Sequence, residues 1–327
     1  MAMQSTRLKS RNVENWRVKV DKLNKIDKEL LSQISDLHNI PQGSYNIRKN
    51  GKLLSRNDDT DIQIVSKKNK DGIDIIVKPN IKNKSVHIPV IITEAGINDL
   101  VYNDFYIGEN AEVTIVAGCG VHNSGAVESS HNGIHSFHIG KNAKVVYIEK
   151  HLGLGKGKSG KILNPVTNIV MEQNSYLEMQ TVQLGGVTYS NRNTKAKLKA
   201  SSELNIKENI LTTDNQKANT NFVVELLGDN CKCNVVSRSV AKNISSQIFK
   251  SKLVGKSNCF GRVECDAILL DNAQVKSIPE IDARNVDATL NHEATVGKIA
   301  GEQLLKLMTL GLTEQEAEDV IIKGFLK

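Results

Sequence analysis

The spacing of apolar residues separates a helical N-terminus from a long β-rich body. Between residues 8 and 37, apolar side chains recur every three or four positions, which places them on one face of a helix. They are Val13, Trp16, Val20, Leu23, Ile26, Leu30 and Ile34. Pro41 and Gly43 then close the segment. From Tyr45 onward, short runs such as 62–65 and 73–77 are rich in β-branched residues and predict strands.

A repeat runs through the middle of the chain. The segment IGENAEVTIV begins at Ile107, and its close match IGKNAKVVYI begins at Ile139. The turn asparagines of these and a third, looser copy are Asn110, Asn142 and Asn174, each 32 residues from the next. Asparagine tolerates the left-handed backbone of a tight corner, and stacked coils bury a core that one coil alone cannot. We therefore predict a mainly β fold, a right-handed parallel β-helix (β-solenoid) over residues 45–292.

The last 35 residues return to a helical period. One predicted helix carries Ile299, Leu304, Leu305, Leu307 and Met308, and Gly311 is placed to end it. Thr313 and Glu316 have the spacing of a capping box that opens a second helix. The chain is thus expected to have an N-terminal helical segment (1–44), a β-helix core (45–292) and a small C-terminal helical module (293–327).

Composition and charge narrow the function classes. Aromatic residues are only 4% of the chain, which argues against a base-stacking surface or an aromatic sugar-binding cleft. Residues 1–84 hold 18 Lys/Arg against 10 Asp/Glu, so the net charge of +7 lies in the N-terminal quarter. No nucleic-acid motif accompanies it, and we interpret it as a solvated helix and loops. Without a membrane-length apolar run or a signal-peptide core, we expect a cytoplasmic protein that binds neither nucleic acid nor membrane.

One candidate site is a histidine-rich segment at 118–140, followed by a further histidine downstream. Its possible metal ligands are Cys119, His131, His135 and His151. The simpler interpretation is that these side chains pack in or on the solenoid. The metal interpretation would make the protein a mononuclear metal-binding protein or a metalloenzyme. The chain has five cysteines, an odd number, and no disulfide framework is expected.

A second candidate site combines GRVECDAILL at 261–270 with LNHEA at 290–294. Cys265, His292 and Glu293 offer a soft, a borderline and a hard ligand, a set compatible with iron. A Cys–His nucleophile pair competes with this interpretation. The P-loop, GxSxG and HExxH patterns are absent from the sequence, and no obvious set of carboxylates suggests polysaccharide cleavage.

The C-terminal part of the chain resembles a known family. The stretch CDAILLDNAQVKSIPEIDARNVDATLNHEATVGKIAGEQLLKLMTLGLTEQEAEDVIIKGFL is similar to the C-terminal core of the SufB/SufD scaffold proteins. The segments NPVTNIVMEQ, TVQLGGVTYSNRNTKAKL and SRSVAKNISSQIF also look like that family's solenoid. The resemblance covers roughly residues 90–327. Leu305–Lys306 and Thr309–Leu310 depart from the family's usual Phe-Tyr and Ser-Arg.

The resemblance implies a non-enzymatic scaffold that assembles a transient iron–sulfur cluster with a SufC-type ABC ATPase and passes it to acceptor proteins. Cys265 falls on the SufB cysteine that nucleates the cluster, Glu293 on a nearby SufB glutamate, and His292 on the SufD histidine that faces that cysteine. Because one chain carries all three, the resemblance implies a homodimer without a separate SufD. The helices at 298–327 match the ATPase-binding region, through Glu302, Gln303, Leu304, Gly311, Glu316, Ala317, Gly324 and Phe325.

Overall fold

The computed structural model describes residues 23–35, 37, 43–155 and 159–327, which form a mainly β solenoid of about eight turns. Two sheets make its walls. Sheet A has the order β2 (Lys52–Asn57), β1 (Ser44–Lys49), β5 (Lys84–Ile92), β7 (Glu112–His122), β9 (Lys144–Leu154), β12 (Tyr176–Gln183), β14 (Glu203–Thr212), β16 (Lys232–Ala241), β18 (Phe260–Leu269), β20 (Thr289–Gly297). This confirms the predicted β-solenoid.

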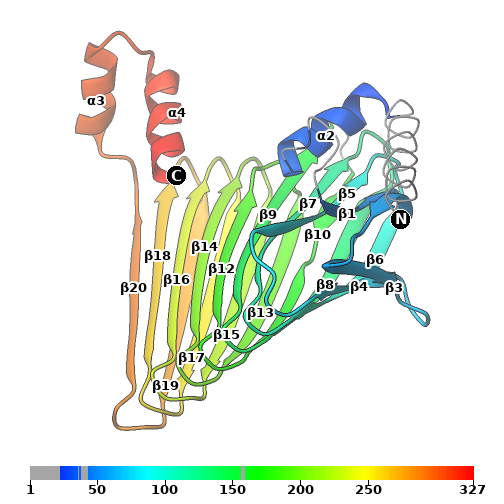
Figure 1. Cartoon of the computed structure of the whole chain (residues 1–327). Coiled ribbons are helices and arrows are strands. Elements are labelled where there is room, and N and C mark those ends of the chain that lie inside the picture. Colours follow the sequence, from blue (N-terminus) through cyan, green and yellow to red (C-terminus); the bar gives the residue numbers. More distant parts are fainter. Residues whose placement is uncertain (1–22, 36, 38–42, 156–158) are drawn as a thin grey trace.

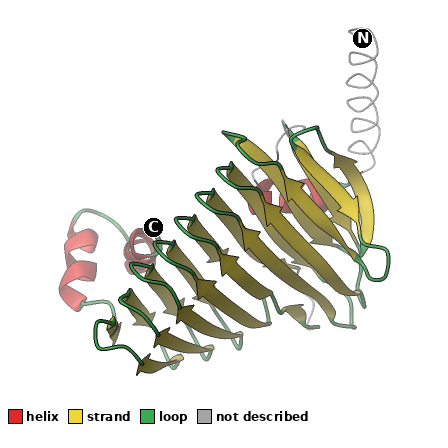
Figure 2. Cartoon of the chain, turned by 60° about the horizontal axis from the view of Figure 1, so that its bottom comes forward, coloured by secondary structure: helices red, strands yellow, loops and turns green. Residues whose placement is uncertain are grey.

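Sheet B faces sheet A across the lumen. Its order is β19 (Gln274–Ala283), β17 (Ser246–Gly255), β15 (Lys217–Leu226), β13 (Tyr189–Leu198), β10 (Lys161–Leu163), β8 (Ser129–Ile139), β6 (Asn98–Ile107), β4 (Gly72–Val77), β3 (Ile62–Ser66), with β11 (Val166–Met171) pairing β13 and β8. Successive coils pair in parallel, and Figure 2 shows them stacked as steps. The hairpins β1–β2 and β3–β4 are antiparallel and lie at the N-terminal end.

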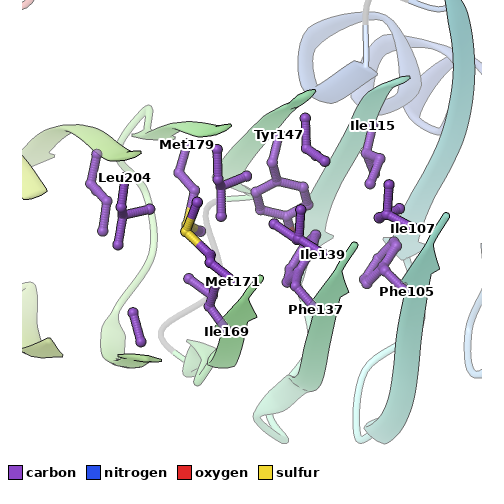
Figure 3. Packing of buried hydrophobic residues seen from close by; sticks show 14 of the residues in the cluster. Phe105, Ile107, Ile115, Phe137, Ile139, Tyr147, Ile169, Met171, Met179 and Leu204 are labelled. Atoms are coloured by element: carbon purple, nitrogen blue, oxygen red, sulfur yellow. The ribbon is translucent and has the colours of Figure 1, made fainter. Parts of the chain in front are cut away.

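Buried and more exposed side chains alternate along each strand, and the buried set builds the core. In β15 every second residue is buried, and β13 and β14 repeat the pattern. Because side chains on a strand point to opposite faces in turn, one set fills the lumen and the other meets solvent. Figure 3 shows the inward set, in which Phe105 stacks on Phe137 with ring centroids 4.4 Å apart and Tyr147 packs edge-on against Phe137. One continuous core runs along the solenoid.

The repeated asparagines form a ladder along one corner. Asn80, Asn110, Asn142 and Asn174 all have left-handed backbone, with φ between 56° and 62°. The Asn142 side-chain amide donates to Asn110 Oδ1 at 2.9 Å, and the Asn174 amide donates to Asn142 Oδ1 at 3.2 Å. The 32-residue spacing in the sequence is therefore one full coil of the solenoid.

Asn142→Ala is expected to lower the free energy of unfolding by about 1–2 kcal/mol, because alanine has no amide for the ladder and is strained in the left-handed region. Urea unfolding followed by circular dichroism measures this. Asn142→Gly keeps the backbone conformation while losing the same two hydrogen bonds, and it should cost less than alanine. Equal losses in both variants would contradict the assigned backbone strain.

Helix α2 (Lys25–Ser35) packs on the outer face of sheet A over β5, β7 and β9 (Figure 1). Leu30 and Ile34 are fully buried there, as the spacing predicted, while Val13, Trp16 and Val20 lie outside the described residues. Gly118 and Gly120 in β7 permit the close approach, since a Cβ on Gly118 would lie 2.4 Å from the Ile34 carbonyl oxygen. The two glycines beside Cys119 thus form a helix-docking surface.

The C-terminal module consists of α3 (Gly301–Thr309) and α4 (Glu314–Phe325) at the far end of the solenoid from α2 (Figure 1). Thr313 and Glu316 form the predicted capping box. Lys242 pairs with Glu318 at 2.5 Å, and Asn209 donates to the Leu326 carbonyl, so α4 is fastened to sheet A. Among the described helices, none is long and apolar enough to cross a membrane.

Candidate functional site at the open end of the solenoid

The last coil leaves its inner face uncovered. Strands β19 and β20 end their sheets, so each has a neighbour on one side only. Ile281 is in register with buried Leu253 and Val296 with buried Ala267, yet their exposed fractions are 46% and 43%. Positions that would be core in any other coil therefore face solvent at this end.

Cys265 lies one strand inside this open end. It points into the lumen from β18, is only 1% exposed, and is in register with Ser237 on β16 and Ala294 on β20. Burial raises the pKa of its thiol to about 11, while the Ser277 hydroxyl acts in the opposite direction. Cys265 is thus a neutral thiol in this structure, and metal binding there must displace its proton.

His292 shares the inner face with Cys265. It lies on β20 in register with Val263, and its Nδ1 is 3.2 Å from the Ser251 hydroxyl. Its Nε2 is buried and has no hydrogen-bond partner in the described part of the chain. Burial lowers the pKa of the imidazole, which favours the neutral form that ligates metals. The sequence-predicted Cys265 and His292 therefore share one inner surface.

Glu293 lies on the opposite face of β20. It is in register with Glu264, and Arg262 Nη2 bridges the two carboxylates at 3.1 Å and 2.8 Å. Because adjacent residues of a strand point to opposite faces, Glu293 is directed outward wherever His292 is directed inward. Of the three predicted residues, only Cys265 and His292 lie on the same face.

The histidine-rich segment contributes to a polar network inside the lumen. His131 Nδ1 lies 2.9 Å from Asp99, His135 Nδ1 lies 2.9 Å from the Tyr147 hydroxyl, and His151 Nε2 lies 3.5 Å from Glu149. A cavity of about 20 Å³, large enough for one water, is lined by all three histidines and Cys119. No group of three or more His, Cys, Asp or Glu in the described ranges is arranged to hold a metal ion. The geometry gives the mononuclear-metal alternative no support.

An ion cluster continues the network toward Cys265. Arg192 donates to Glu149 at 2.6 Å and lies 3.5 Å from Glu208, and all three side chains are at most 8% exposed. Glu208 accepts hydrogen bonds from Thr220 and Ser237, at 3.1 Å and 3.0 Å. Sequence reasoning did not single out Glu149, Arg192 or Glu208. The sequence did hold a signal for these residues. Each lies at a strand position whose side chain points inward, where an apolar residue is expected.

The buried histidines make the fold sensitive to acid. Burial lowers the pKa of His135 from 6.5 to about 4, so the unfolded chain binds a proton there that the folded chain excludes. Stability from this group is full above pH 6.5 and is lost as pH falls toward about 4, by up to about 3 kcal/mol. Thermal unfolding between pH 7.5 and 4.5 measures the loss. His135→Gln should flatten the profile, whereas His138→Gln, on the exposed face of the same strand, should leave it steep.

Comparison with known proteins identifies a family. Residues 100–325 match the family model described as SUF system FeS cluster assembly, SufBD core domain. An iron–sulfur cluster assembly SufBD family protein of Methanocaldococcus jannaschii is 30% identical over 292 residues, covering 87% of this chain and 90% of that protein. Another of the same family, from Archaeoglobus fulgidus, is 26% identical over 84% of this chain and 73% of its own length.

A third relative, an iron–sulfur cluster assembly SufBD family protein of Pyrococcus horikoshii, is 25% identical and covers 84% of both chains. The family match runs from within β6 to the end of α4, and it includes Cys265 on β18 and His292 on β20. The chain therefore belongs to the SufBD family of iron–sulfur cluster assembly proteins.

Proposed function

We propose that this protein is a non-enzymatic scaffold on which a labile iron–sulfur cluster is built at a homodimer interface. The observation that carries the proposal is the open end of the solenoid, where Cys265 on β18 and His292 on β20 line one inner face and the His292 Nε2 has no partner among the described residues. A cluster with few thiolate ligands would leave more readily than one held by four cysteines. In this proposal the cluster is cargo, passed on to acceptor proteins.

A second copy of the chain suits the open end. Strands β19 and β20 present unpaired backbone groups, and unpaired edges favour pairing with another chain. A two-fold axis would bring the same surface of each copy together, so Ile281 and Val296 would be covered by their equivalents. Each copy would then contribute a cysteine and a histidine to one enclosed site. Glu293 would join the site after β20 moves or Arg262 releases it.

Ile281→Asp is expected to convert the dimer to a monomer, because it introduces a charge where the proposed interface is apolar. Sedimentation velocity measures the change. Leu53→Asp offers a matched control: Leu53 is 50% exposed on edge strand β2, at the other end of the solenoid. Wild type that sediments as a monomer at all concentrations would overturn the proposed homodimer.

The helical module offers a docking surface for a SufC-type ATPase. Leu305, Met308 and Leu310 on and after α3, and Val320 on α4, are 40–76% exposed. Of the residues that the family resemblance implied, Ala317 is fully buried and Glu316 belongs to the capping box. We propose that those two maintain the module while the exposed apolar residues contact the ATPase. Because α3 follows β20 directly, ATP-driven movement of the ATPase would act on the strand that carries His292.

Anaerobic reconstitution with ferrous iron and sulfide tests the scaffold proposal. Wild-type protein should acquire charge-transfer absorbance in the visible range together with protein-bound iron and acid-labile sulfide. Stoichiometric zinc without sulfide would instead favour the metal-binding alternative. If no cluster forms alone or with a SufC-type ATPase and ATP, the scaffold proposal fails.

A further inference from the structure

Two buried cysteines outside the proposed cluster site occupy equivalent corners of consecutive coils. Cys231 precedes β16 and Cys259 precedes β18, 28 positions later. Their backbones are joined, because Phe260 N–H donates to the Cys231 carbonyl at 3.0 Å and Asn230 N–H donates to the Asn258 carbonyl at 2.7 Å. The register Lys232↔Phe260 therefore continues through Cys231 and Cys259.

This stacking satisfies the main requirement for a disulfide. Neighbouring strands lie about 4.8 Å apart, and bridged cysteines have Cα atoms about 4.4–6.8 Å apart. Both side chains are buried, with exposed fractions of 0% and 4%. The Cys259 thiol contributes to raising the pKa of Cys231 after burial itself, which agrees with their proximity. By comparison, Cys231 and Cys233 are two residues apart where the chain enters β16, and a two-residue step of extended chain is about 6.7 Å, near the upper limit.

We propose that Cys231 and Cys259 are an oxidative modification site. They form an intramolecular disulfide that links the corner before β16 to the corner before β18. The inference is independent of the proposed cluster chemistry. Hydrogen peroxide is the oxidant considered. One thiolate attacks the O–O bond, forming a sulfenic acid and releasing hydroxide, which becomes water. The second thiol then displaces water from the sulfenic acid and forms the S–S bond. Overall, two thiols and one hydrogen peroxide give one disulfide and two water molecules.

Only the last coil of the solenoid separates Cys259 from the open end. Cys259 lies beneath Ala288 and Leu290, two half-buried residues of the last coil that pack on the core. A Cβ on Gly255 would be 3.2 Å from Cys259 Sγ, which places that thiol against the backbone of the preceding strand. The disulfide would link the start of β16 to the start of β18, the strand that carries Cys265. Oxidised protein would therefore resist separation of its terminal coils.

Peroxide treatment of the full chain, followed by alkylation after unfolding and peptide mapping without reductant, tests the proposal. The chain has five cysteines, all reduced in the structure. We expect two of them to become protected, a mass loss of two hydrogens, and a linked peptide pair containing Cys231 and Cys259. The rate should rise with pH, because the thiolate is the reacting species and the pKa of Cys231 is about 11. The oxidised form should unfold at a higher temperature than the reduced form.

Single variants distinguish this pair from other cysteines. Cys231→Ser and Cys259→Ser should each abolish the crosslink, whereas Cys233→Ser, a buried neighbour two residues from Cys231, should leave it intact. The mapping on wild type decides the question even if a variant fails to fold. A disulfide between any other two cysteines, or five alkylatable thiols after prolonged oxidation at high pH, would overturn the proposal.

Discussion

Cys265→Ser is expected to reduce iron and sulfide binding after anaerobic reconstitution to background, while wild type binds both. A serine hydroxyl is a hard donor that keeps its proton at neutral pH, whereas a thiolate is the soft ligand that iron–sulfur clusters require. Cys265 is the only cysteine of β18, the strand that pairs with β20, in the part of the chain that the structure describes. Visible absorbance and chemical analysis of iron and sulfide give the measurement.

Cys259→Ser is the matched control for this experiment. Cys259 lies six residues before Cys265, is similarly buried, and points into the same lumen. The control should bind a cluster at the wild-type level, which separates loss of a ligand from the general cost of a buried hydroxyl. A cluster that survives in Cys265→Ser would move the assembly site toward Cys119 and the lumen histidines.

Arg192→Met is expected to lower the free energy of unfolding by about 3–5 kcal/mol. The guanidinium lies between Glu149 and Glu208, 2.6 Å and 3.5 Å away, and its removal leaves two carboxylates buried without their cation. Burial raises the pKa of Glu208 even with Arg192 present, and the loss of Arg192 would raise it further. Chemical denaturation at pH 7 measures the change.

Two further variants test the cause assigned to this loss. Lys207→Met breaks the pair with Glu178, which is 3.0 Å long but has a lysine that is 63% exposed, so its cost should stay below about 1 kcal/mol. Adding Glu149→Gln and Glu208→Gln to Arg192→Met should restore part of the stability, because the uncompensated charges disappear. A cost for Arg192→Met equal to that of Lys207→Met would show that the lumen is more hydrated than its burial indicates.

Much of the architecture followed from local pattern. Asn110, Asn142 and Asn174 mark one corner per coil, and the β-rich segments around them require stacked coils because one coil cannot bury its own inner face. The capping box at Thr313 and the apolar stripe of α2 are likewise local signals, and both elements lie where the sequence predicted. Cys265 and His292 were candidates by their donor chemistry, and the family resemblance assigned their roles.

The tertiary structure decided which residues meet. Glu149, Arg192 and Glu208 are far apart in sequence, yet coil stacking brings them within hydrogen-bond or ion-pair distance inside one lumen. Because adjacent side chains of β20 point to opposite faces, His292 is directed inward and Glu293 outward. The donor types of the two residues alone do not show this separation. The open end is also a property of the assembled solenoid, because Ile281 and Val296 resemble core residues in the sequence. Only the absence of a following coil leaves them exposed, since a strand is buried by its neighbours as well as by its own pattern.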